Sequence, residues 1–234
     1  MLIDKNAPGT QEKVLSILKN MPAGKILDAP CGEGALSQRL IENKFDVFCV
    51  DIDEAYFKLQ SVPFTKADLN KPLPFEDGYF DYAVSVEGIE HLENPFSCIR
   101  EFARVLKKGG SLVITTPNIM SIKSRTRFFI YSYHDFFRFI DIDDSFRHTH
   151  PEYTHEHINP MTFMELRYAL QKAGFDVTGI YTNRYVKPKK WSIMYTFIKS
   201  LVIRKTKGRL PKDKDLVSDE ILEGEILILH ARRR

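Results

Sequence analysis

The stretch from residue 26 to residue 34, ILDAPCGEG, combines an acidic side chain with two glycines. An apolar run ends in Asp28, and Gly32 and Gly34 follow, so the backbone can turn sharply and approach a ligand closely. A phosphate-binding loop would continue with Gly-Lys-Ser/Thr, and a dinucleotide-binding loop would carry a third glycine where Ser37 stands. A carboxylate at the end of the strand would also repel a pyrophosphate resting on the next helix. The stretch therefore indicates a ligand whose nearest part is neutral or cationic.

A second acid, Asp51, lies at the end of the next apolar run, FDVFCVDI. A carboxylate in that place can accept hydrogen bonds from both hydroxyls of a ribose. The ligand then has a ribose, lacks a pyrophosphate and tolerates an acid beneath the glycine turn. S-adenosylmethionine, which joins an adenosine to a sulfonium and an amino acid, meets these three conditions, and we expect it to be the cofactor.

These acids must be positioned by a sheet that brings strand ends together. Short, continuous, β-branched runs alternate with helical patterns, which is typical of a parallel sheet covered on both faces. Strands are expected at 25–29, 45–52, 62–68, 80–86, 111–117, 175–185 and 224–233, and helices at 10–20, 34–43, 53–60, 95–107 and 159–174. With right-handed crossovers this order predicts an α/β fold with a doubly wound, seven-stranded, mostly parallel sheet. Thr10 is expected to cap the first helix, and Pro160 to stand in the first turn of the last.

Four stretches resemble those of the class I S-adenosylmethionine-dependent methyltransferases. They are ILDAPCGEG (26–34), CVDID (49–53), KADLNKPLPFEDGYFDYAVSVEGIEHLENP (66–95) and EFARVLKKGGSLVITTPN (101–118), in the expected order and spacing. The resemblance is strongest to the branch that includes ubiquinone-pathway methyltransferases and bacterial enzymes of glycan and small-molecule modification. It implies a Rossmann-like methyltransferase fold. Pro30 departs from the pattern, since many members have glycine there, and proline lacks a backbone N–H.

The resemblance also implies cofactor contacts within each motif. The first turn would lie along the methionine part, Asp51 would bind the ribose, and Ile52 would flank the adenine. Asp68, beside Leu69, would accept a hydrogen bond from the adenine amino group. The predicted cofactor-binding residues are Asp28, Ala29, Pro30, Gly32, Gly34, Asp51, Ile52, Asp68, Leu69, Val86 and Glu87, of which the last two would lie near the sulfonium. On the residues alone, Asp51 and Asp68 are also ordinary turn residues at strand ends.

Histidines are the candidate bases for taking a proton from a hydroxyl acceptor. His91 follows the fourth predicted strand, and His155 and His157 lie in DIDDSFRHTHPEYTHEHINP (141–160), after the fifth. We predict these three as catalytic residues, while a histidine bonded to a helix start and a plain surface loop stay open as alternatives. Imidazole and carboxylate groups of this stretch are also of the type that binds metals. No strict motif sets their spacing, so no metal ligand is predicted.

The positive charge of the chain is concentrated in one segment. Residues 184–212 hold ten Lys and Arg and no acid, so the rest of the chain is net acidic and does not resemble a nucleic-acid binder. Between Lys190 and Arg204 lies a mostly apolar stretch with helical spacing, too short to span a bilayer. An apolar face with cationic flanks is typical of an interfacial helix. We expect peripheral membrane contact through residues 187–207, with packing on the core or in a homodimer interface as the alternatives.

The chain length and composition fit one globular domain. Its 234 residues are 43% hydrophobic and 28% charged. We expect a single methyltransferase domain over 1–234, made of a cofactor-binding core (1–117), an aromatic and histidine-rich acceptor-side cap (118–160) and a basic amphipathic insertion (186–222). The three cysteines are scattered, and the first residues lack the apolar region of a signal peptide. We therefore expect a cytoplasmic protein, peripheral to the inner face of the membrane if the basic helix binds there.

The expected function is methyl transfer from S-adenosylmethionine to a small-molecule or glycan/lipid-linked acceptor, at oxygen. Three alternatives stay open: a quinone-ring or other small-molecule O- or N-methyltransferase, a non-catalytic S-adenosylmethionine-binding regulator or scaffold, and a nucleotide-linked dehydrogenase. The sequence does not identify the acceptor, because acceptor pockets lie in the parts of the chain that carry no motif.

Overall fold

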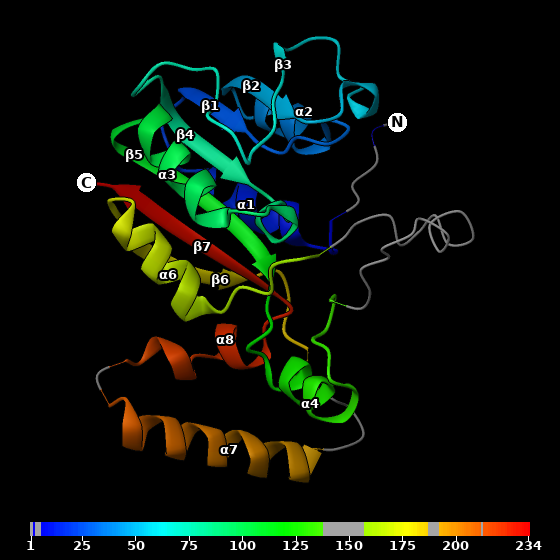
Figure 1. Ribbon diagram of the computed structural model, residues 1–234, viewed down its shortest axis with the longest axis vertical. Coiled ribbons are helices and arrows are strands. Elements are labelled where there is room, and N and C mark those ends of the chain that lie inside the picture. The colour runs from blue at the N-terminus through cyan, green and yellow to red at the C-terminus, as the bar shows by residue number, and fades with distance from the viewer. Residues whose placement is uncertain (1, 3–5, 138–156, 187–191, 212) are drawn as a thin grey trace.

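The computed structural model describes residue 2 and residues 6–137, 157–186, 192–211 and 213–234. Its centre is one seven-stranded sheet with the strand order β3-β2-β1-β4-β5-β7-β6 (Figure 1). The strands are β1 (Lys25–Asp28), β2 (Asp46–Asp51), β3 (Phe64–Lys66), β4 (Phe80–Ser85), β5 (Leu106–Pro117), β6 (Phe175–Thr182) and β7 (Ile226–Arg233). Only β7 runs antiparallel to its neighbours, β5 and β6. The predicted doubly wound, mostly parallel α/β sheet is confirmed.

Helices cover both faces of the sheet. The helices are α1 (Thr10–Leu18), α2 (Ala35–Glu42), α3 (Pro95–Val105), α4 (Ile122–Tyr131), α6 (Phe163–Lys172), α7 (Ser192–Arg209) and α8 (Asp219–Glu223), and short 3-10 turns are η1 (Glu54–Tyr56), η2 (Ile89–His91) and η4 (Asp215–Val217). Two buried clusters form because the strands are apolar on both sides: α1 and α2 pack on one face, and α3 and α6 on the other. This packing leaves the strand ends free to carry the site.

Four features differ from the sequence-based expectation. The helix expected over 53–60 is only the turn η1, because the Asp53 carboxylate accepts from Ala55 N and the chain becomes extended at Phe57, whose ring stacks on Phe64. The last predicted helix begins at Phe163, after a capping box formed by Thr162 and Glu165, so Pro160 precedes it.

The remaining differences concern Thr10 and the start of β5. Gly9, at φ 85°, is the N-cap residue of α1, and Thr10 is the first helical residue, with its hydroxyl directed to Glu87. The strand expected at 111–117 begins instead at Leu106, and residues 107–110 form an irregularity within it, where Gly109 takes a φ of 76° and the pairing with β4 shifts from Phe80–Leu106 to Tyr82–Ser111.

The order of the strands creates a crevice at one edge of the sheet. The chain moves outward from β1 through β2 to β3, and then returns to the other side of β1 to form β4 and β5. In open α/β sheets, ligands bind beyond the carboxyl ends of the strands at the point where this direction reverses. Asp28 and Asp51 are the last residues of β1 and β2, and Val86 follows β4 directly, so all three reach this edge.

Three helices form an extension beyond the sheet. Ile122 of α4, Tyr195 of α7 and Leu222 of α8 make a small buried cluster of their own. Figure 1 shows α7 at the end of the molecule opposite β3, with α4 and α8 between it and the sheet. In the part of the chain that the structure describes, no helix combines the length and the apolar character needed to cross a bilayer.

Candidate functional site

A cavity of about 1130 Å³ opens at the carboxyl ends of β1, β2 and β4. It brings together most of the residues that the sequence analysis predicted as cofactor ligands. Those that line it are Asp28, Pro30, Gly32, Asp51, Ile52, Asp68, Leu69, Val86 and Glu87. Ala29 and Gly34 do not line it: Ala29 is fully buried and donates its N–H to Val84 O, and Gly34 faces Leu59 and Phe57.

The two glycines of the turn after β1 have different surroundings. Gly32 has a φ of 53°, and a Cβ built there would meet no heavy atom within 4 Å. Gly34 has a φ of 92°, and its Cβ would lie 2.9 Å from Leu59 Cβ. Both positions need the left-handed region that glycine tolerates best. Gly32 therefore leaves space for a ligand at the backbone, whereas Gly34 lets the turn pack against the chain after β2.

The carboxylate of Asp51 connects the end of β2 to the glycine turn. Its Oδ2 accepts from Gly32 N at 2.8 Å, and its Oδ1 accepts from Asp53 N at 3.2 Å. A carboxylate oxygen can accept a second bond, so both oxygens keep the capacity to bind hydroxyls. Beside it, the side chain of Ile52 is 62% exposed and lines the cavity, which suits one face of a planar aromatic group.

Asp28 lies beneath the glycine turn and is almost completely buried. Its Oδ2 accepts from Ser37 Oγ at 2.6 Å. Burial raises the pKa of this carboxyl to about 7, and the charge of Asp51 adds to the rise. A cationic group bound nearby would favour the ionised form of Asp28, whereas a bound pyrophosphate would oppose it.

Asp68 and Asn70 form the wall of the cavity after β3. Asp68 Oδ1 accepts from Asn70 N at 2.9 Å and from Asn70 Nδ2 at 3.1 Å, and this hydrogen bonding lowers the pKa of Asp68. One carboxylate oxygen therefore shapes the turn, while the other lies 3.5 Å from Lys71 Nζ at the half-exposed rim. Leu69 between them is buried and contributes apolar surface.

Glu87 holds the N-terminal segment against the cavity. Its Oε1 accepts from Ala7 N at 3.1 Å and from Thr10 Oγ1 at 3.3 Å, and its own N–H donates to Thr115 Oγ1. Asn6, Ala7, Pro8 and Gln11 line the cavity as a result. Sequence reasoning missed these four residues, because neither the segment before residue 10 nor the helical pattern after it carries a motif for a ligand.

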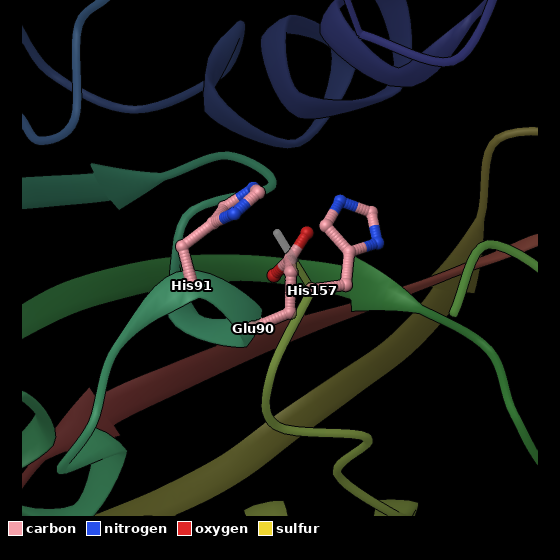
Figure 2. A group of neighbouring side chains, drawn as sticks. All are labelled: Glu90, His91 and His157. Carbon is pink, nitrogen blue, oxygen red and sulfur yellow. The ribbon is translucent and has the colours of Figure 1, made fainter. Parts of the chain in front are cut away.

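A cluster of three side chains lies at the opposite side of the cavity, with two of them in its wall and the third buried behind them (Figure 2). His91, in η2, and His157 both line the cavity, and their ring centroids are 4.6 Å apart at an interplanar angle of 73°. Figure 2 shows the Glu90 side chain between them. Glu90 is completely buried, and burial raises the pKa of its carboxyl to about 8. The sequence analysis did not select Glu90, and the predicted residue His155 lies outside the described residues.

The described part of the predicted acceptor-side cap also reaches the cavity. Lys123, Asp135 and Phe136 line it, and Phe137 packs on the His157 ring with centroids 5.2 Å apart. Other aromatic side chains of α4 face the solvent, and Phe129 is 89% exposed. The rest of the cap, over 138–156, lies outside the described residues.

The cavity residues fit S-adenosylmethionine better than a phosphate-bearing nucleotide. The open space at Gly32 suits an amino acid. The carboxylate of Asp51 has free acceptor capacity that suits a ribose, and the exposed Ile52 suits an adenine. The buried Asp28 would disfavour an added anionic group. The expected cofactor is thus consistent with the donors and acceptors in the cavity.

Comparisons with known proteins agree with this assignment. Residues 6–179 match the family model described as a methyltransferase domain. A probable S-adenosylmethionine-dependent methyltransferase of Mycolicibacterium smegmatis is 31% identical over 112 residues, which is 46% of this chain and 44% of the relative. A ubiquinone biosynthesis O-methyltransferase of Dechloromonas aromatica is 33% identical over 106 residues, 41% of this chain and 46% of the relative. The chain therefore matches less than half the length of these curated relatives.

The solved structures show the same fold. A SAM-dependent methyltransferase from Archaeoglobus fulgidus superposes with a TM-score of 0.60 at 20% identity, over 96% of this chain and 95% of that one. A SAM-dependent methyltransferase from Mesorhizobium loti superposes with a TM-score of 0.58 at 16% identity, over 95% and 96% of the two chains.

Proposed function

The chain belongs to the methyltransferase-domain family, and from this premise we propose that it transfers a methyl group from S-adenosylmethionine to an oxygen of a small-molecule or lipid-linked glycan acceptor. One observation carries the proposal. The glycine turn and Asp51 line the same cavity as His91 and His157, so a donor site and candidate bases share one space. The matched O-methyltransferase of ubiquinone biosynthesis also favours oxygen, with a quinone-ring hydroxyl as the second candidate acceptor.

The chain's own residues supply alignment and proton removal in this reaction. The cofactor, when bound, supplies a methyl group on a sulfonium that is open to in-line attack. Asp51 and the backbone around Gly32 hold and orient the nucleoside and amino acid parts, which is where most of the rate advantage of such a displacement arises. His91 or His157 accepts the acceptor's hydroxyl proton at an imidazole nitrogen.

The extension formed by α4 and α7 supports an acceptor that is bound to a membrane. Lys199 of α7 pairs with Asp219 and Glu223, so that side of the helix faces α8. Ile193 and Phe197 on α7 are 87% and 67% exposed. Neither α7 nor α4 contains an acid, and both carry several Lys and Arg. Exposed apolar residues on a helix rich in Lys and Arg suit the surface of an anionic bilayer, and we propose the peripheral membrane contact there.

Calorimetric titration with S-adenosylhomocysteine tests the cofactor part of the proposal. Asp51→Ala removes the carboxylate at the end of β2, and the loss of charge-assisted hydrogen bonds predicts an affinity lower by about tenfold to a hundredfold. Asp46→Ala is the matched control, because Asp46 is exposed at the opposite end of the same strand. Equal affinities of the Asp51 variant and the wild type would refute the ribose assignment, and NAD binding in place of S-adenosylhomocysteine would refute the function.

A further inference from the structure

Glu90, His91 and His157 each offer a ligand atom, and these atoms all lie within 4.8 Å of one another. We propose that the three side chains bind a divalent transition-metal cation at the acceptor side of the cavity. The sequence analysis expected no metal ligand, because the local spacing of the histidines carries no motif. The spatial cluster joins residues from two distant segments, and Glu90 was not among the candidates.

The state of Glu90 is the observation that points to a cation. Its side chain is completely buried, and neither carboxylate oxygen makes a hydrogen bond of normal geometry with the described residues, so the Thr116 hydroxyl and the Glu90 backbone stabilise its charge only weakly. A buried carboxylate without a partner is costly, so such groups are found paired with a cation or bound to a metal. Figure 2 shows this carboxylate directed into the space between the two imidazole rings.

The backbone holds the cluster in place before any ligand binds. Glu90 O accepts from both Ile158 N and Asn159 N at 2.9 Å, which positions His157 beside η2. Asn159 Nδ2 adds a hydrogen bond to Leu92 O. A metal site needs ligands fixed by a rigid support, and these bonds join the turn after β4 to the segment before α6. The cluster is therefore a consequence of tertiary structure and not of a chance encounter of surface side chains.

The ligand set indicates the type of cation. Two imidazoles and one carboxylate suit Zn²⁺, Co²⁺ or Fe²⁺ better than Mg²⁺ or Ca²⁺, which prefer oxygen ligands. Three protein ligands also leave coordination positions open, as in catalytic and not structural zinc sites. Because His91 and His157 line the cavity, these positions face the space for the acceptor.

The role of the cation rests on the proposed function. A metal-bound hydroxyl loses its proton near neutral pH much more readily than a free one, because the cation stabilises the oxyanion. The acceptor oxygen would bind the metal, lose its proton and attack the methyl carbon, while the bond from that carbon to sulfur breaks and its electron pair remains on sulfur. With the cation bound, His91 and His157 are its ligands, so metal activation takes the place of either histidine as the base, and the released proton passes to solvent.

Cobalt titration of the chelator-treated, full-length chain tests the site. We expect one Co²⁺ to bind with a visible d–d absorption that reports nitrogen and oxygen ligands. Glu90→Gln and His157→Ala should each lower the affinity by more than about tenfold, since even the loss of outer-sphere partners has an effect of that size. His230→Gln is the matched control, because His230 lies in β7 and hydrogen-bonds Thr178, away from the cluster.

The same variants separate this inference from the proposed function. Glu90→Gln should bind S-adenosylhomocysteine with unchanged affinity in calorimetry, because Glu90 does not line the cavity. Co²⁺ binding that is equal in the wild type and in the Glu90 and His157 variants would overturn the metal site, as would the absence of stoichiometric binding. If either result occurs while the affinity for S-adenosylhomocysteine is unchanged, the metal site is refuted and the proposed methyltransferase function stands.

Discussion

The Oδ2 atom of Asp51 accepts a hydrogen bond from the backbone N–H of Gly32 at 2.8 Å. The carboxylate at the end of β2 thus stabilises the turn that follows β1, and both face the same cavity. This contact joins two motifs that are separate in the sequence into one binding surface. It also means that Asp51 has a structural role in addition to its proposed role in holding a ribose.

Alanine substitutions of the two glycines should have different effects. Gly32→Ala introduces a methyl group into the open cavity and about 1 kcal/mol of backbone strain, so the main loss should be affinity for S-adenosylhomocysteine, by about tenfold. Gly34→Ala causes similar backbone strain and also a clash with Leu59. It should lower the free energy of unfolding by roughly 2–3 kcal/mol. Urea unfolding and calorimetry measure the two quantities. Equal affinities for Gly32→Ala and the wild type would argue against close approach of the cofactor there.

The buried carboxyl of Asp28 should make stability depend on pH. Its pKa is raised from 3.8 to about 7 in the folded chain, so between these values the folded state binds more protons than the unfolded state. The free energy of unfolding should therefore fall as pH rises through this window, by at most about 1.4 kcal/mol per pH unit from this group. Urea unfolding at several pH values, wild type against Asp28→Asn, isolates the effect. If the free energy of unfolding changes with pH in the same way in both proteins, the prediction for Asp28 is wrong.

Release of the N-terminal segment from Glu87 should weaken cofactor binding. Thr10→Val keeps the shape of a completely buried side chain but removes the hydroxyl that donates to Glu87, at a cost of about 1 kcal/mol. Because the same segment places Asn6 and Pro8 at the cavity, we expect faster proteolysis before residue 10 and lower affinity for S-adenosylhomocysteine. Ser16→Ala, on the exposed side of α1, is the control. If Thr10→Val shows the wild-type rate of proteolysis and the wild-type affinity, the Thr10–Glu87 hydrogen bond has no part in binding S-adenosylhomocysteine.

The exposed face of α7 should bind anionic vesicles. Replacing both Ile193 and Phe197 by Ser removes apolar surface that would enter the bilayer, and cosedimentation with vesicles should fall several-fold. Binding should also weaken with added salt, since the cations of the segment contribute about 1 kcal/mol each near the surface. Tyr168→Ser removes an aromatic group that is 54% exposed on α6 and should have no effect. Retention of vesicle binding by the double variant would locate the contact elsewhere.

The alternation of apolar strands and helices was sufficient to predict the sheet. The ends of β1, β2 and β4 fall within one or two residues of the expected ends, because buried parallel strands appear as continuous apolar runs between polar turns. The helix expected after β2 does not form, since the capped turn at Asp53 and the Phe57–Phe64 stack favour an extended chain. Such a tertiary contact overrides a weak local propensity and leaves no local pattern in the sequence.

The sequence by itself determined which strand-end acids meet at one edge of the sheet. Asp28 and Asp51 follow apolar runs, and the carboxyl ends of parallel strands share one edge of a sheet, so local pattern alone brings these acids together. Only the tertiary structure decided the other side of the cavity. The Thr10–Glu87 bond spans 77 positions, and the His91–His157 contact likewise joins distant segments. No spacing rule applies at such separations, because the path of the intervening chain, and not a helical or strand period, determines which side chains meet.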